Sequence, residues 1–382
     1  MEERKEKVIY DLWLDSLWEC APKQKHMLLE NYGDSYTVWS EGIEDVKEGM
    51  KSGAQENDRI RSLEEAEEIY YHMKEQGIQA IAWDDEDFPE SLRTINQPPW
   101  MLYVYGRKEL LYEPCVSVVG ARKATDYGMK IASELGYRIS ETGTVMVSGM
   151  ASGIDAWAHR GALDHGLPMK NANTIAVLAG GVDICYPKSN YKLYHEIKNQ
   201  GAIVSEFRPG VRPRTYYFPL RNRIISGLSQ ATVIVEAAVG SGSLITAELA
   251  MEQGREVFAV PGNIDRVGSV GTNKLIKDGA SILISTEDLI QELHLERENC
   301  VSIGGNLGRV DESVLGTDEK IILKFLLQNG EATTDHLVRA TGLTTSRING
   351  LVTILEMKGI VSTAIGKIFL AKKFENLYNM PL

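Results

Sequence analysis

Residues 207–223 combine two kinds of side chain that together recognise nucleic acids. The segment reads FRPGVRPRTYYFPLRNR, and from Phe207 to Val235 the chain carries five arginines and no acidic residue. Guanidinium groups bind phosphate oxygens through paired hydrogen bonds, and aromatic faces such as that of Phe218 stack on nucleobases. Because a duplex hides the faces of its bases and a single strand exposes them, this mixture predicts a site for single-stranded nucleic acid. The alternative is an arginine-rich loop that pairs with the acidic N-terminal part of the chain.

Three loops rich in glycine and small residues offer further places for a phosphate. They read GARKATDYG (120–128), SGMASGID (148–155) and GSGSLITA (240–247), and their small residues allow the backbone to approach a ligand closely. Arg122 and Lys123 precede a predicted helix, whose N-terminus favours anions. Lys188 follows a proline and is expected on the same rim as Arg122. The alternative for the first loop is an ordinary strand-to-helix turn with a surface arginine.

Other reactive residue types give weaker signals. Asp155 and His159 lie four residues apart and share a helix face, which suits an acid/base couple or half of a metal site. We interpret them as a hydrogen-bonded orienting pair, since no third metal ligand has suitable spacing. Cys185 has no evident activating base and is expected to be an inert thiol, and the four scattered cysteines predict neither disulfides nor a zinc site. The glycine loops lack dinucleotide and P-loop spacing, so we expect no cofactor, no metal and no catalytic residue.

The elements that position these loops alternate between strand and helix. Apolar runs of strand length lie at 115–119, 144–147, 174–179, 202–205, 231–235, 256–260 and 281–284, with helical stretches between most of them. Such a pattern predicts a parallel sheet covered by helices on both faces, the doubly wound or Rossmann-like α/β fold. Ligands bind such sheets at the carboxyl ends of the strands, where these loops lie.

The regions on either side of this alternating pattern are predicted to be mainly helical. Helices are predicted at 8–14, 25–32 and 62–76, and the acidic run at 64–68 is interpreted as a solvated helix face rather than a docking surface. We divide the chain into a helical domain (1–76), an extended Rossmann-like domain (77–295), a glycine-containing linker (296–316) and a C-terminal domain (317–382). Predicted helices at 318–328, 334–340 and 345–358, followed by strands at 360–363 and 367–370, suggest a winged helix. Its recognition helix has only Arg347 and Lys358 as cations, so duplex DNA and protein remain equal candidates as partner.

Overall composition bounds the class of protein. The 382 residues carry a net charge of −12, but 24 of the 53 acidic and 11 of the 41 basic residues lie in residues 1–100, so the rest of the chain is nearly neutral. Overall acidity therefore does not exclude a polyanionic partner, because binding depends on the local field. No apolar stretch approaches the ~20 residues of a membrane span, and the charged N-terminus is unlike a signal peptide. We expect a cytoplasmic protein without membrane insertion.

Taken together, the loops resemble the DprA/Smf family, the DNA-processing proteins of natural transformation. The matching motifs are VGAR at 119–122, VSGMASGIDA at 147–156, LAGGVD at 178–183, FPLRNRIISGL at 218–228, SGSLITA at 241–247 and VPGN at 260–263. The resemblance covers 115–285, and DFPESL at 87–92 extends it. It departs at Ala121, where the family usually has serine. It implies an extended Rossmann domain with a SAM-like helical front and a winged-helix tail of the DprA C-terminal type.

The resemblance also implies a function. Members bind single-stranded DNA without hydrolysing it, protect the incoming strand, form homodimers through the Rossmann domain and load a RecA-type recombinase during competence. The family's functional arginines fall on Arg122, Arg221 and Arg223. The predicted DNA-binding residues are Gly120, Arg122, Lys123, Ser148, Gly149, Lys188, Phe218, Pro219, Arg221, Asn222, Arg223, Ser241, Gly242 and Ser243. The alternative is a LOG-type nucleotide phosphoribohydrolase on a related core, although the turn at 239–247 lacks that family's PGGxGTxxE motif.

Overall fold

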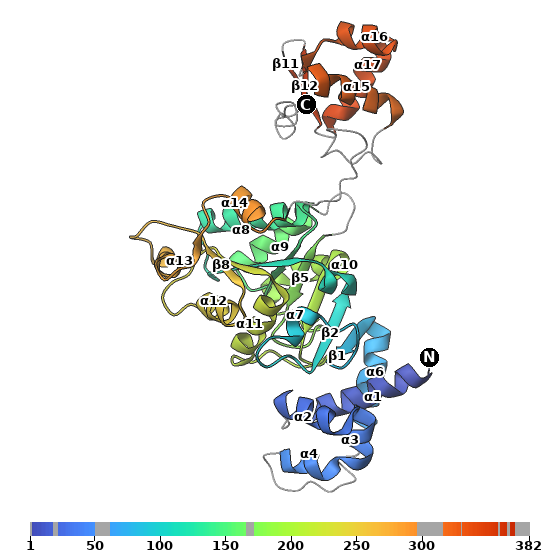
Figure 1. The fold of residues 1–382 in the computed structure, drawn as a ribbon, viewed down its shortest axis with the longest axis vertical. Helices are drawn as coiled ribbons and strands as arrows, with labels where there is room; N and C mark the ends of the chain where they lie inside the picture. Colours follow the sequence, from blue (N-terminus) through green and yellow to red (C-terminus); the bar gives the residue numbers. More distant parts are fainter. Residues whose placement is uncertain are drawn as a thin grey trace. The chain divides into compact units, whose positions relative to one another are not determined.

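The computed structural model describes residues 2–17, 22–49, 62–165, 172–295, 316–329, 331–357, 360–364 and 367–370. Contacts divide the chain into two compact units, Met1–Glu296 and Arg297–Leu382 (Figure 1). The predicted linker lies outside the described residues except for Gly316. The boundary placed at 76/77 falls inside the first unit and stays a prediction.

A nine-stranded sheet forms the centre of the first unit. Its strands are β1 (Ile78–Ala82), β2 (Met101–Gly106), β3 (Cys115–Val119), β4 (Val145–Ser148), β5 (Thr174–Val177), β6 (Ala202–Ser205), β7 (Ala231–Ile234), β8 (Glu256–Ala259) and β9 (Ser281–Ile282). They lie in the order β1-β2-β6-β5-β4-β3-β7-β8-β9, and the seven strands from β6 to β9 are mutually parallel. The seven predicted strands are thereby confirmed. The pair β1 and β2, which the sequence analysis missed, extends the sheet in antiparallel fashion beside β6.

Helices cover both faces of the parallel sheet, as predicted. They are α7 (Glu90–Arg93), α8 (Asp126–Glu141), α9 (Ile154–His165), α10 (Tyr191–Gln200), α11 (Tyr217–Leu228), α12 (Gly242–Glu252), α13 (Val267–Lys277) and α14 (Thr286–Glu292), with short 3-10 turns at Lys108–Tyr112 and Lys188–Asn190. Alternate strand residues point to opposite faces, so Val116 packs with Leu135 of α8 while Val119 packs with Ile224 of α11. The strand order reverses direction between β3 and β7, which makes the ends of these two strands the switch point of the fold.

The N-terminal helices share a hydrophobic core with the edge of the sheet. They are α1 (Glu2–Ser16), α2 (Pro22–Tyr32), α3 (Ser35–Glu41), α4 (Ile43–Gly49) and α6 (Glu64–Gln76). Trp13 is buried in one cluster with Trp100 and Tyr103, and the Tyr103 hydroxyl donates to Asp15 at 2.7 Å. The acidic side chains of the run at 64–68 are exposed, as expected for a solvated face.

The second unit contains three helices and a small sheet. Helices α15 (Thr317–Asn329), α16 (Thr334–Thr341) and α17 (Thr345–Met357) pack over strands β10 (Glu331–Ala332), β11 (Val361–Ala364) and β12 (Lys367–Leu370), which are ordered β10-β12-β11. Gly342 takes the left-handed conformation that ends α16 (φ +72°), at the turn predicted between the second and third helices. Strand β10 was not predicted, and Lys358 lies outside the described residues. Throughout the described ranges, no helix has both the length and the apolar character needed to cross a bilayer.

Candidate nucleic-acid interface

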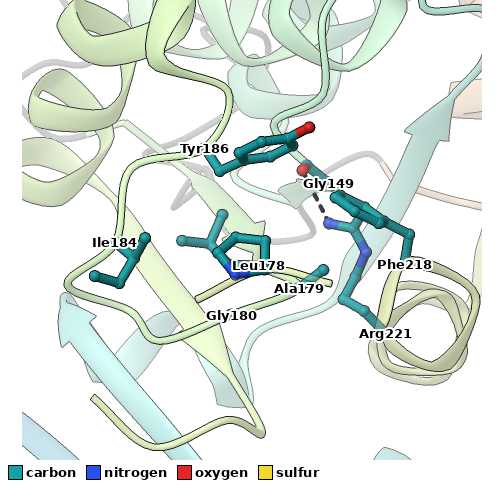
Figure 2. Close-up of a pocket in the computed structure, with 9 residues that line it drawn as sticks. Gly149, Leu178, Ala179, Gly180, Ile184, Tyr186, Phe218 and Arg221 are labelled. Atoms are coloured by element: carbon teal, nitrogen blue, oxygen red, sulfur yellow. Dashed lines mark hydrogen bonds between the residues drawn. The ribbon is translucent and has the colours of Figure 1, made fainter. Parts of the chain in front are cut away.

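A small pocket opens where the loops after β4, β5 and β6 meet at the carboxyl edge of the sheet. It is lined by Gly149, Leu178, Ala179, Gly180, Ile184, Tyr186, Pro213, Phe218 and Arg221. Figure 2 shows the rings of Tyr186 and Phe218 near the Arg221 guanidinium, which points toward Gly149. The structure therefore brings together a glycine loop and the FPLRNR motif, as the sequence predicts for residues at the ends of parallel strands.

Arg221 joins two of the segments that line this pocket. Its side chain is only 4% exposed, and its guanidinium donates to the carbonyl oxygens of Gly149, at 2.9 Å, and of Val177. Burial lowers the pKa of Arg221 to about 10, while the carboxylate of Asp155 acts in the opposite direction. A guanidinium engaged by two carbonyls fixes the loop after β4 to the end of β5. Arg221 was predicted to hold a phosphate; the structure places it in the lining of the pocket with little exposed surface, and the phosphate contact stays a prediction.

The loop after β4 is shaped by backbone contacts rather than by exposed side chains. A Cβ atom on Gly149 would lie 2.5 Å from an Arg221 nitrogen, so only glycine fits there without displacing the arginine. Met150 has a φ of +54°, and its carbonyl accepts from Asn190 at 2.9 Å. Ser148 is fully buried and its hydroxyl donates to Val118 at 2.6 Å, so that this predicted contact residue faces the sheet.

Asp155 and His159 do not form the pair predicted from their spacing. Asp155 accepts from the backbone N–H groups of Gly149 (3.2 Å) and Ala151 (3.3 Å), and burial raises its pKa. His159 lies 2.8 Å from the Thr174 hydroxyl through Nδ1. Complete burial lowers the pKa of His159 to about 3, and the positive charge of Arg221 adds to the effect. Both residues stabilise the fold around the pocket, each with its own partner.

Arg122 is the exposed cation at the rim of the pocket. Its guanidinium lies 5.2 Å from the centre of the Phe218 ring, and Phe218 in turn lies 5.6 Å from Tyr186 between ring centres. The backbone of its loop is fixed because Ile154 donates to the Ala121 carbonyl at 3.2 Å. Gly153, with a φ of +80°, packs so closely on this loop that a Cβ would lie 2.3 Å from the same oxygen. Arg122, Phe218 and Tyr186 together form what we call the rim cluster.

Two further predicted cations lie on the same edge. Lys123 follows Arg122 directly and is exposed, and Lys188 is exposed two residues after Tyr186. In the described part of the chain, Arg122, Lys123 and Lys188 form no ion pair with an acidic side chain. Their charges are therefore directed at solvent, where a phosphate backbone would pass.

The five arginines of residues 207–235 separate into two groups. Arg208 pairs with Glu65 of α6, and Arg223 is buried in an ion pair with Glu206 at 2.5 Å while also donating to the Gln97 carbonyl at 3.0 Å. Together with Arg221, these side chains support the fold, and for Arg208 the predicted alternative of pairing with the N-terminal region is realised. Arg212 and Arg214 are exposed, and Arg214 donates to the Tyr216 hydroxyl at 3.2 Å.

The remaining predicted contacts lie at the start of α11 and α12. Ser241 caps α12 and its hydroxyl lies 2.8 Å from that of Ser243, while Asn222 donates to the Gly242 carbonyl at 3.3 Å. Pro219 and Gly242 are exposed, and Ser243 is buried. Gly120 is half-buried against Ile154, which a Cβ atom would approach to 2.7 Å. The hydrogen bond of Asn222 thus joins the middle of α11 to the first residue of α12.

Two residues of this region were missing from the predicted contacts. Tyr186 completes the rim cluster, and its position before a proline in a loop after a strand is the only sequence signal for it. Glu236, buried directly beyond β7, accepts from the backbone N–H of Thr125 at 3.0 Å and from its hydroxyl at 2.5 Å. An acidic residue directly after a buried strand at the switch point was a signal that could have identified it.

The described residues contain no cluster of three or more His, Cys, Asp or Glu side chains suited to a metal ion. Cys185 is half-buried and its Sγ lies 3.7 Å from the Pro187 carbonyl. Burial raises the pKa of the Cys185 thiol, which disfavours the reactive thiolate and agrees with the interpretation as an inert thiol.

Comparisons with known proteins connect this geometry to a family. A sequence profile described as DNA recombination-mediator protein A matches residues 79–294, more than half of the chain. The DNA processing protein DprA of Bacillus subtilis is 37% identical over 249 residues, 65% of this chain and 82% of the relative. The X-ray structure of DprA from Streptococcus pneumoniae is similar with a TM-score of 0.62 and 33% identity, covering 74% of this chain and 97% of that one. A DprA structure from Helicobacter pylori, which concerns the single-stranded DNA binding mode of that protein, has a TM-score of 0.51 and 30% identity, covering 57% and 95%.

Proposed function

Because this chain belongs to the DprA/Smf family of DNA recombination mediators, we propose that it binds single-stranded DNA across the carboxyl edge of its sheet. A role in DNA processing follows from family membership. In the fuller proposal, the protein protects an incoming strand during natural transformation and loads a RecA-type recombinase on it. The binding mode reported for the Helicobacter pylori relative supports the choice of single-stranded DNA.

The rim cluster is the observation that carries the proposal. An exposed arginine 5.2 Å above a phenylalanine ring can bind a phosphate while the ring packs on the neighbouring base. Tyr186 extends the aromatic surface, and Lys123 and Lys188 supply further positive charge at the same edge. A strand would therefore meet a base-stacking surface flanked by cations, which suits binding with little sequence preference.

The buried arginines of the FPLRNR motif have a supporting role in this proposal. Arg221 holds the loop that carries Gly149, and Arg223 joins α11 to Glu206 beyond β6. Neither guanidinium can reach a strand at the surface without giving up these partners. We therefore assign phosphate contacts to Arg122, Lys123 and Lys188, and positioning to Arg221 and Arg223.

Binding without hydrolysis is the form of activity that the site favours. Asp155 and His159, the acid and base that follow the loop after β4, are both buried and hydrogen-bonded to the fold. A general acid or base has to reach the reacting group directly or through one water. The LOG-type phosphoribohydrolase finds no support in the comparisons.

The proposal extends to partners and flanking domains. Ile264, Val267, Ile282 and Ile284 are exposed apolar side chains near β9 and α13, and such a surface supports a homodimer through the Rossmann-like domain. We propose a SAM-like fold for residues 1–76 and a winged helix for residues 317–382. Arg347 of α17 pairs with Asp318 at 3.0 Å, which weakens its attraction for duplex DNA and favours a protein contact for that domain.

The binding site is tested by fluorescence anisotropy with a labelled dT oligonucleotide and a matched duplex over a salt series. The wild-type protein should bind the single strand more tightly than the duplex. Arg122→Ala should lower the affinity for single-stranded DNA whatever its sequence. It should also reduce the magnitude of the slope of log association constant against log salt concentration by about one. Arg160→Ala is the matched control, because Arg160 also lies over an aromatic ring, Trp157, at 4.7 Å, but on α9. Equal slopes for Arg122→Ala and wild type would show that the rim cluster does not hold the strand.

The homodimer needs its own measurement. Sedimentation velocity of wild type and of Ile284→Asp compares the association of the two proteins. We expect a dimer for the wild type and a shift toward monomer for the variant, because a charge opposes burial of this surface. A monomeric wild type at micromolar concentration would exclude the dimer.

A further inference from the structure

The carboxylate of Glu236 lies at the N-terminus of helix α8, hydrogen-bonded to the N-cap residue Thr125. In doubly wound folds this position, at the switch point after the first strand, is where the phosphates of a nucleotide cofactor bind. Here Glu236 lies directly beyond β7 and its carboxylate accepts from the Thr125 N–H at 3.0 Å and from the Thr125 hydroxyl at 2.5 Å. Thr125 is the N-cap of α8 and its hydroxyl also accepts from the Gly128 N–H at 3.1 Å.

Glu236 occupies the space beside the first turn of α8. Its side chain is 6% exposed, and a Cβ atom on Gly128 would lie 2.5 Å from the carboxylate carbon, so the carboxylate lies against the first turn of the helix. Among the residues that the structure describes, no lysine or arginine forms an ion pair with Glu236. The buried charge is therefore stabilised by the helix N-terminus and the N-cap hydroxyl, the groups that would otherwise bind a phosphate.

We propose that Glu236 is a specificity-determining residue that excludes free nucleotides and dinucleotides from the switch point of the sheet. Its carboxylate takes the place of a phosphate at α8. The same contact anchors the loop that presents Arg122, because Thr125 lies three residues beyond Arg122. Anions can then bind only on the solvent-exposed side of the loop that carries Arg122. A polynucleotide backbone can bind along this open surface, whereas a small nucleotide cofactor would need an enclosed site. This second consequence rests on the proposed binding of single-stranded DNA, whereas the exclusion of nucleotides does not.

The test measures whether removal of the carboxylate opens an anion site. Thermal unfolding of wild type, Glu236→Ala and Glu236→Gln is followed while sodium pyrophosphate replaces sodium chloride at constant ionic strength. Glu236→Ala should unfold at a lower temperature than wild type and recover by about 3 °C at about 10 mM pyrophosphate, as expected for a millimolar site. Wild type and Glu236→Gln, in which the side chain still fills the space, should gain less than Glu236→Ala, because in them pyrophosphate can bind only to the exposed cations of the rim.

The outcomes separate the two proposals because no DNA is present in this measurement. A pyrophosphate response of wild type equal to that of Glu236→Ala would overturn the inference, as would a folded Glu236→Ala that does not respond. If Glu236→Ala does not fold, Glu236→Ser replaces it, and titration of wild type with ADP remains decisive. Binding of ADP to wild type that persists in Arg122→Ala would mean that the α8 position is open. Absence of ADP binding supports its closure.

Discussion

The guanidinium group of Arg221 lies against the α-carbon of Gly149 and donates to the carbonyl of the same residue at 2.9 Å. The side chain of Arg221 thereby extends from α11 to the loop after β4. Its guanidinium occupies the space that a side chain at position 149 would need. The contact explains why a glycine occurs at 149 and why an arginine of an apparently exposed basic motif is buried. Both residues also line the pocket, together with Phe218 and Tyr186 (Figure 2).

Gly149→Ala should destabilise the protein by about 1–3 kcal/mol, the usual cost of overpacking a well-packed site. The new methyl group would lie 2.5 Å from an Arg221 nitrogen that cannot retreat without losing its carbonyl partners. Urea denaturation measures the change in the free energy of unfolding. Gly242→Ala is the control, because a Cβ there meets nothing within 4 Å, and it should change the free energy of unfolding by less than about 0.5 kcal/mol. Equal effects of the two substitutions would contradict the packing argument.

The buried ion pair between Arg223 and Glu206 should be costly to break from one side. Arg223→Met leaves the Glu206 carboxylate without its cation, and a loss of about 3–5 kcal/mol in the free energy of unfolding is expected. Adding Glu206→Gln should recover part of that loss, because the uncompensated charge is removed. Unfolding of the two single variants and the double variant gives the coupling energy. Additive losses would show that Arg223 acts independently of Glu206.

Phe218 should contribute to binding through its ring. Phe218→Ala is expected to weaken single-stranded DNA binding by about 1–3 kcal/mol, the range for loss of one stacked base, while Phe218→Trp should retain affinity. Anisotropy with a labelled dT oligonucleotide at fixed salt provides the measurement. Tyr137→Ala removes an aromatic ring that is 40% exposed on α8 and serves as the control for general effects of losing a surface ring. An unchanged affinity for Phe218→Ala would exclude the ring as a stacking surface.

His159 should make the protein less stable in acid. Burial lowers the pKa of His159 from 6.5 to about 3. Between these two pH values the imidazole ring is protonated in the unfolded chain and neutral in the folded protein. Stability is therefore lost as the pH falls from 6.5 toward 3, on the order of 3 kcal/mol between pH 7 and pH 4. His159→Gln should have a correspondingly flatter dependence of the free energy of unfolding on pH. His294→Gln, at an exposed position, should retain the wild-type slope, and a wild-type slope for His159→Gln would mean that the ring titrates normally in the folded protein.

Periodicity was sufficient for the framework of the protein. Seven buried strands and the helices between them follow from apolar runs of strand length that alternate with helical stripes, because a sheet covered on both faces must be apolar throughout. Strands β1 and β2 escaped this reasoning. Strand β1 pairs antiparallel with β2, and β2 pairs antiparallel with β6. Antiparallel neighbours need no crossover helix between them, so the alternation of strands and helices in the sequence did not predict these two strands.

Residue type and loop position were also sufficient to locate the candidate site. Ligands of doubly wound sheets bind at the carboxyl ends of the strands, so the sequence alone assigns the glycine loops and the FPLRNR segment to one edge of the sheet. The exposed Arg122 beside Phe218 agrees with that expectation.

Only the tertiary structure decided which charged groups face solvent. Arg122 and Arg221 are the same residue type in equally plausible motifs, yet Arg122 is exposed over the half-buried ring of Phe218 and Arg221 is 4% exposed. Partners such as the Gly149 carbonyl, Glu206 and Thr125 come from segments far apart in the chain, and no local pattern encodes them. The sequence by itself determined the sheet, the edge where ligands bind and the chemistry available there. Long-range packing determined which arginines are exposed to bind phosphate and which are buried to hold the loops in place.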